Sequence, residues 1–123
     1  MTPTSAPRFR FPAKRRLKLT AEFERVRREG KTVRGSLLLL GALRVEEEKR
    51  FRVGFVTSRR VGKAVVRNRA RRRLRELVRK RQHHLRAGYW FVLIARPAAA
   101  NASSDTLEKE WARLATRAGI LAT

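Results

Sequence analysis

The segment RVGKAVVRNRARRRLRELVRK, residues 60–80, constrains the fold of this chain more than any other. Ten of its twenty-one residues are Lys or Arg, and Glu76 is its single acid. At helical spacing one side of the segment is apolar, formed by Val66, Ala70, Leu74, Leu77 and Val78. The opposite side carries Asn68, Arg71, Arg72, Arg75 and Arg79. The pattern predicts a helix that buries one face against a sheet and presents arginines on the other.

The charge of this helix predicts a negatively charged partner. Like charges at helical spacing repel one another, and the segment has too few acids to neutralise them. The whole chain has 32 Lys and Arg against 10 Asp and Glu among 123 residues, a formal net charge of +22. The first 96 residues hold 29 of these basic and 7 of the acidic groups, which is the entire excess. Such a balance favours binding to a polyanion, and we expect nucleic acid rather than a membrane or a calmodulin-like partner.

Composition also excludes several classes of protein. Hydrophobic residues make up 42% of the chain, too many for a disordered basic tail. There is no Cys, which excludes disulfides, thiolate nucleophiles and Cys-ligated zinc. No apolar run approaches the roughly 18–20 residues that span a bilayer, and the N-terminus lacks the apolar segment of a secretory signal. We therefore expect a cytoplasmic protein with no membrane partner.

The remaining sequence predicts one α+β domain over residues 17–120, preceded by a flexible basic arm over residues 1–16. Thr20 is the expected cap of a helix ending near Gly30. Two strands are predicted at residues 32–45 and 50–58, and the apolar run GYWFVLIA at 88–95 predicts a strand buried on both faces. Asp105 and Glu108 have the spacing of a capping box before a last amphipathic helix. The expected order is helix, strand, strand, helix, strand, helix, a compact α/β sandwich.

Candidates for protein-based catalysis are few. His83 and His84 are adjacent, so they lie on different faces of a helix, and we interpret them as polar residues near its end. The triplet Glu46–Glu48 is best interpreted as a solvated turn, and Glu76 as a helix salt-bridge partner of Arg72 or Lys80. No nucleophile with an adjacent base and no glycine-rich phosphate loop is present. The sequence predicts no catalytic residue and no metal or cofactor bound by the protein alone.

The segment GKAVVRNRARRRLRE at residues 62–76 closely resembles the arginine-asparagine-arginine signature helix of the bacterial ribonuclease P protein component. The resemblance extends to RRLKLTAEFERVRREG at 15–30, FRVGFVTSRRVGKAVVRNR at 51–69 and VLIARPAA at 92–99. It therefore covers about residues 15–99 in the order that the family shows. It implies a ribosomal protein S5 domain 2-like fold with a left-handed β-α-β crossover, whereas right-handed crossovers are the general expectation.

The resemblance also implies a function. The family's protein joins a large catalytic RNA that uses Mg²⁺, bound mainly by that RNA, to remove the 5′ leader of precursor tRNA. The expected partners are thus the catalytic RNA and precursor tRNA, with no obligate protein partner, and the enzyme is an endoribonuclease whose chemistry the RNA performs. A ribosomal or other structural RNA-binding protein is the alternative. DNA architecture and membrane disruption have no motif in their favour.

Residue roles follow from the same resemblance. The residues expected to bind the catalytic RNA are Arg67, Asn68, Arg69, Arg71, Arg72 and Arg75. Those expected in a cleft for the 5′ leader, between the first helix and the sheet, are Phe23, Arg27, Arg52, Thr57, Arg60 and Arg96. Two positions differ from many family members, because Arg27 and Gly41 stand where aromatic residues are frequent. Phe23 has a purely structural alternative as a core residue beneath the helix.

Overall fold

The computed structural model describes residues 16–121, so the predicted basic arm lies outside the described residues except for Arg16. The described part contains three α-helices and four strands. They are α1 (Thr20–Glu29), β1 (Lys31–Arg34), β2 (Leu38–Arg44), β3 (Arg52–Thr57), α2 (Ala64–Arg81), β4 (Tyr89–Ala95) and α3 (Ser104–Ala118). Three short 3₁₀ helices, η3 (Arg59–Val61), η4 (Gln82–His84) and η5 (Pro97–Asn101), connect them.

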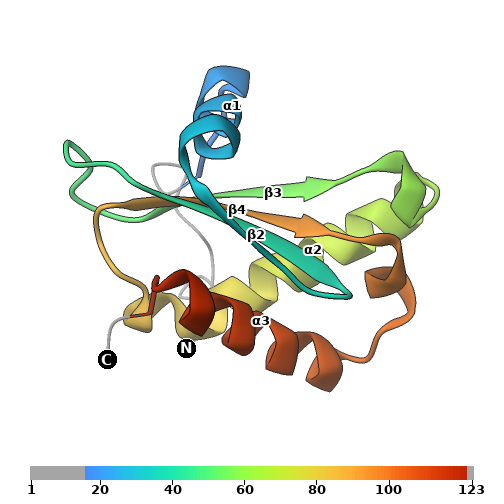
Figure 1. The fold of residues 1–123 in the computed structure, drawn as a ribbon. Helices are drawn as coiled ribbons and strands as arrows, with labels where there is room; N and C mark the ends of the chain where they lie inside the picture. Colours follow the sequence, from blue (N-terminus) through green and yellow to red (C-terminus); the bar gives the residue numbers. More distant parts are fainter. Residues whose placement is uncertain (1–15, 122–123) are drawn as a thin grey trace, which may run out of the picture.

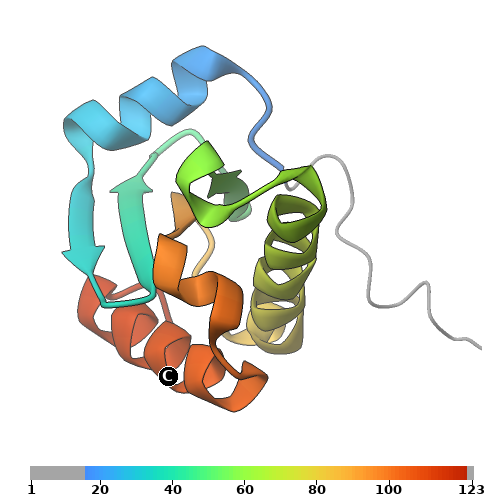
Figure 2. The ribbon, with the colours of Figure 1, turned by 90° about the vertical axis from the view of Figure 1, so that its right-hand side faces the viewer.

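The strands form one sheet in the order β1-β2-β4-β3. The β1–β2 and β2–β4 pairs are antiparallel, whereas β3 and β4 are parallel and joined through α2. Helix α1 covers one face of the sheet, and α2 and α3 cover the other (Figures 1 and 2). The two views together show that the β3-α2-β4 crossover is left-handed. The α+β class and the predicted order of elements are confirmed.

The first predicted strand is divided into two, which sequence periodicity did not indicate. The chain turns between β1 and β2 at Gly35 and Ser36, and the backbone N–H of Gly35 donates to Leu38 O at 2.8 Å. A side chain at position 35 would not fit, since a Cβ there would lie 2.4 Å from the Glu110 carboxylate. The glycine therefore allows the hairpin to approach α3 closely.

Each face of the sheet has its own apolar cluster. On β4, Phe91, Leu93 and Ala95 belong to the large cluster with α2 and α3. Val92 belongs to the smaller cluster beneath α1, where Trp90 and Ile94 pack against it. Side chains alternate between the faces of a strand, so a strand covered on both faces needs apolar residues at every position. The prediction from the run at residues 88–95 is confirmed.

Both predicted helix caps are wrong by one or two residues. Thr20 is the first residue of α1, and the cap residue is Leu19. The Glu22 carboxylate supplies the capping interaction by accepting from the backbone N–H groups of Lys18 at 2.9 Å and Leu19 at 3.0 Å. Helix α3 is capped by Ser103, whose Oγ accepts from Thr106 N at 3.1 Å. The Asp105–Glu108 spacing therefore does not form a capping box.

Candidate nucleic-acid interface

Helix α2 has the two faces that its sequence predicts. Ala70, Leu74, Leu77 and Val78 are buried against the sheet and α3. The opposite side carries Arg69 and Arg72, which are exposed, and Arg67, Arg71, Arg75 and Arg79, which are half-buried. The only acid on the helix, Glu76, pairs with Arg79 rather than with Arg72 or Lys80, and the hydrogen bond from Arg79 lowers the pKa of Glu76. Salt bridging of Glu76 is thus confirmed with a different partner.

Three signature residues of α2 are exposed to solvent, namely Asn68, Arg69 and Arg72. Within residues 16–121, neither Arg69 nor Arg72 forms an ion pair with a carboxylate. An unneutralised guanidinium gains most from a phosphate, which it can bind with two parallel hydrogen bonds. This exposed part of α2 is the strongest candidate for contact with RNA.

The other three signature arginines, Arg67, Arg71 and Arg75, form a half-buried row along α2. Arg67 Nη1 donates to Gly62 O at 2.9 Å, and Arg71 Nη2 donates to Thr57 Oγ1 at 2.9 Å. Burial lowers the pKa of Arg75, and the charges of Arg16, Arg71 and Arg72 lower it further. This row therefore adds positive potential to the exposed face while its members also pack against the domain.

Arg73 differs from its neighbours on α2 because it binds the protein itself. Its guanidinium donates to the backbone carbonyls of Ala99, at 3.3 Å, and Ala102. These bonds tie α2 to η5 and the residue that follows it. The role of Arg73 is structural.

A hollow of about 170 Å³ lies between α1 and the sheet. Two residues predicted in the leader cleft, Phe23 and Arg27, line this hollow. Gly41, the other position that differs from many family members, lines it as well. Its other lining residues are Glu24, Thr32, Val56, Val92 and Ile94. The floor is apolar, whereas Glu24 and Arg27 supply charge. An apolar floor beside a guanidinium suits a nucleobase, which has a flat apolar face and polar edges.

Two glycines give this hollow its shape. The Phe23 ring lies directly over Gly54 of β3, where an added Cβ would lie 2.3 Å from the ring. At Gly41 of β2 an added Cβ would lie 3.3 Å from Val26 Cγ1. The first glycine lets Phe23 approach the sheet, and the second leaves part of the lining without a side chain. Gly54 was not identified from the sequence, although a glycine within a strand signals close approach of another group.

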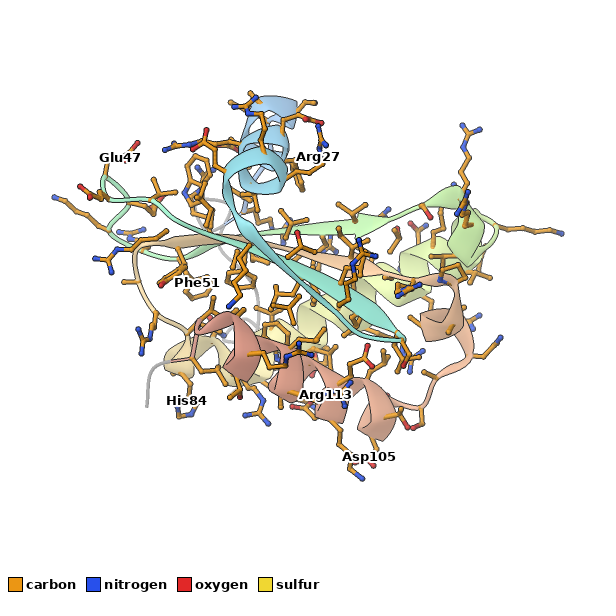
Figure 3. The ribbon with its side chains drawn as sticks, viewed as in Figure 1. Arg27, Glu47, Phe51, His84, Asp105 and Arg113 are labelled. Atoms are coloured by element: carbon orange, nitrogen blue, oxygen red, sulfur yellow. The ribbon has the colours of Figure 1, made fainter. Side chains whose placement is uncertain are left out.

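Arg27 is exposed on α1 above the sheet (Figure 3). Its Nη2 lies 2.5 Å from Glu24 Oε1, and its Nε donates to the same oxygen at 3.2 Å. This interaction lowers the pKa of Glu24. The pair has the i, i+3 spacing of neighbours on a helix, and both residues line the hollow.

The other four predicted cleft residues lie elsewhere. Arg52, at the start of β3, donates to Glu22 and to the backbone of Arg16. Thr57 ends β3 and bonds Arg71 of α2. Arg60 is exposed in η3, and Arg96 is exposed after β4, with its Nη1 donating to Gly35 O at 2.9 Å. The structure thus brings Phe23 and Arg27 together at the hollow, but not these four.

The histidines and the acidic triplet lie outside the two surfaces described above. His83 and His84 are exposed in η4, the interpretation made from the sequence. In the turn after β2, Glu46 and Glu47 are exposed, whereas Glu48 accepts from Trp90 Nε1 at 2.9 Å. Among residues 16–121 no three His, Asp or Glu side chains are grouped as a metal site requires. No helix of the described part is long and apolar enough to cross a membrane.

The ribonuclease P family profile matches residues 11–119 of the chain. The chain belongs to the ribonuclease P protein family. The ribonuclease P protein component of Symbiobacterium thermophilum is 42% identical over 106 residues, which cover 86% of this chain and 92% of that protein. The component of Roseiflexus castenholzii is 40% identical over 107 residues, which cover 86% of this chain and 87% of that protein.

A solved structure agrees with these relatives. The Staphylococcus aureus RNase P protein, in a mutant with defective mRNA degradation activity, matches with a TM-score of 0.82 at 25% identity, covering 88% of this chain and 91% of that one. The chain is therefore a protein component of ribonuclease P, a ribonucleoprotein of tRNA processing, and its partner is the ribonuclease P RNA. The family match decides against the alternative of a ribosomal protein.

Proposed function

We propose that the chain assists removal of the 5′ leader from precursor tRNA by binding two RNAs at two surfaces. The exposed face of α2 binds the catalytic RNA, and the hollow beneath α1 receives the leader. The observation that carries the proposal is the face of α2, where Arg69 and Arg72 are exposed and, within the described residues, no carboxylate pairs with them. The hollow lies between α1 and the sheet, on the face opposite α2 (Figure 1), so both surfaces can be occupied at once.

In this proposal the catalytic RNA performs the chemistry. The protein contributes positive charge, which reduces repulsion between two polyanions and lowers the concentration of divalent ions needed to bring them together. Mg²⁺ is then held mainly by RNA, whose phosphate oxygens are the hard ligands that this ion prefers. The side chains of this chain bind and orient RNA and move no proton in the reaction.

Binding to precursor and mature tRNA tests the role of the hollow. In the reconstituted enzyme, Arg27→Ala combined with Phe23→Leu is expected to weaken precursor binding, because the leader loses the ring and the guanidinium. Stacking of one base on an aromatic ring contributes about 1–3 kcal/mol. Mature tRNA has no leader, so its affinity is expected to stay unchanged. The measured quantity is the ratio of the two dissociation constants.

The matched control for this test is Arg28→Ala, which removes an exposed arginine of α1 that does not line the hollow. It is expected to leave the precursor-to-mature ratio close to that of the wild type. An unchanged ratio in the Phe23 and Arg27 variant, with the protein folded, would show that the leader does not run here and that Phe23 is only a core residue.

A further inference from the structure

A network of polar side chains fastens the first turn of α1 to the sheet. Arg52 of β3 lies at its centre, with Nη1 donating to Glu22 Oε2 at 2.8 Å and Nη2 donating to Arg16 O at 2.7 Å. Only 20% of the Arg52 side chain and 14% of the Glu22 side chain are exposed. Both terminal nitrogens of Arg52 are thus engaged inside the protein, which leaves this guanidinium poorly placed to bind RNA.

Glu22 connects the same guanidinium to the start of α1. Its Oε1 accepts from the backbone N–H groups of Lys18 and Leu19, while its Oε2 accepts from Arg52. Burial acts to raise the pKa of Glu22, but the bonds from Leu19, Lys18 and Arg52 outweigh burial and lower it. The charge of Glu22 therefore stabilises the fold at neutral pH, and this contribution is lost only as the pH falls through the lowered pKa.

Trp90 of β4 adds a second contact between α1 and the sheet. The guanidinium carbons of Arg25 and Arg52 lie 5.3 Å and 5.6 Å from the centre of its ring, within the range of cation–π attraction. The indole N–H donates to Glu48 Oε1 at 2.9 Å, which fixes the ring. Arg25 of α1 also lies 3.6 Å from Glu47. The network therefore joins α1, β3, β4 and the turn after β2.

The network lies next to the hollow along the chain. Phe23, which lines the hollow, directly follows Glu22, and its ring lies over Gly54, two residues after Arg52. A shift of the first turn of α1 would lift this ring from the strand. The bond between Glu22 and Arg52 thus joins α1 to β3 one residue from Phe23 and two residues from Gly54.

We infer that Glu22 and Arg52 are positioning residues for the leader, which hold α1 and Phe23 at the distance from the sheet that a nucleobase requires. The inference rests on the proposed leader site, and it gives Arg52 a role other than direct contact with RNA. The two roles of Arg52 predict opposite changes in leader binding when the charge of Glu22 is removed. If Arg52 contacts RNA, removal of a competing carboxylate strengthens leader binding, whereas a positioning role requires that leader binding weaken.

The test compares Glu22→Gln with Glu46→Gln in the reconstituted enzyme. Both substitutions remove one negative charge, but Glu46 is exposed in the turn after β2 and makes no contact with the hollow. We expect Glu22→Gln to lower the precursor-to-mature affinity ratio roughly tenfold, because weakening one charge-assisted hydrogen bond leaves about a tenth of the molecules with α1 in the binding position. Affinity for the catalytic RNA is expected to stay unchanged, which separates this result from general unfolding. A ratio equal to or above that of Glu46→Gln overturns the inference.

Arg52→Lys provides a second variant should Glu22→Gln impair folding. It keeps the positive charge and the backbone bonds of Glu22, but a single ammonium lacks the fork that reaches Glu22 and Arg16 together. A positioning role predicts a loss in the ratio comparable to that of Glu22→Gln, and no further loss when the two substitutions are combined. A wild-type ratio for Arg52→Lys contradicts it. If the wild-type protein itself produces no preference for precursor, the proposed leader site fails, whatever these variants do.

Discussion

Replacing Glu110 with alanine is expected to lower the free energy of unfolding by about 2–5 kcal/mol, because it leaves buried backbone donors without partners. Glu110 lies on the inner side of α3 and is only 4% exposed. Its Oε2 accepts from the N–H groups of Leu37 at 2.7 Å and Leu38 at 2.6 Å. Its Oε1 lies 3.2 Å from both Ser36 Oγ and Arg113 Nη2. The carboxylate thus fastens the β1–β2 turn to α3.

Urea denaturation of the RNA-free protein measures this effect. Asp105→Ala is the matched control, since Asp105 is an exposed residue of α3 that pairs with Lys109 at 3.2 Å. An exposed pair of this kind contributes about 0.5 kcal/mol or less. Glu110→Gln keeps one acceptor oxygen, so the stability of this protein is expected to lie between those of the Glu110→Ala and Asp105→Ala proteins. Equal stability of the Glu110→Ala and Asp105→Ala proteins would contradict the role assigned to the buried carboxylate.

The double substitution Arg69→Gln and Arg72→Gln is expected to produce the largest loss of affinity for the catalytic RNA. Each phosphate contact releases condensed counterions, so log affinity falls as log salt concentration rises. Removing two contacts is expected to make this negative slope shallower by about two. The fold is expected to remain intact or to gain stability, because both side chains are exposed among like charges. The measurement is binding of the catalytic RNA at several salt concentrations, with thermal unfolding of the RNA-free protein.

Arg73→Ala supplies the contrast on the same helix. The substitution breaks the bonds to the carbonyls of Ala99 and Ala102. The free energy of unfolding is therefore expected to fall by about 1–3 kcal/mol, the cost of losing a part-buried charged donor. The slope with salt is expected to change less than in the Arg69 and Arg72 variant. If the two proteins show the same slope, the exposed face of α2 is not the surface that binds the catalytic RNA.

The parts of the fold that depend on local pattern were predictable from the sequence. Helix α2 was visible because apolar residues recur at helical spacing, and β4 because its apolar run is short and continuous. The split of the first strand was not visible, since it depends on Gly35 meeting Glu110, 75 positions further along the chain. The left-handed crossover came from family resemblance alone, because the general preference is right-handed.

The candidate site was predictable to a similar extent. Phe23 and Arg27 were identified, and both line the hollow. The bond between Arg52 and Glu22 was not identified from the sequence, because it joins residues 30 positions apart. Sequence patterns show which arginines share a helix face, but not which of them a distant carboxylate or carbonyl already binds. Glu22 and Glu110 were missed for the same reason, because their partners lie far along the chain. Glu24 was missed although its partner Arg27 is only three residues away on the same helix.

Cleavage of precursor tRNA at low Mg²⁺ tests the proposed function most directly. The assay compares the catalytic RNA alone, the protein alone and the two together, at an Mg²⁺ concentration too low for the RNA alone. The proposal predicts accurate removal of the 5′ leader only when both are present. Failure of the protein to stimulate the RNA, or nuclease activity of rigorously RNA-free protein, would contradict it.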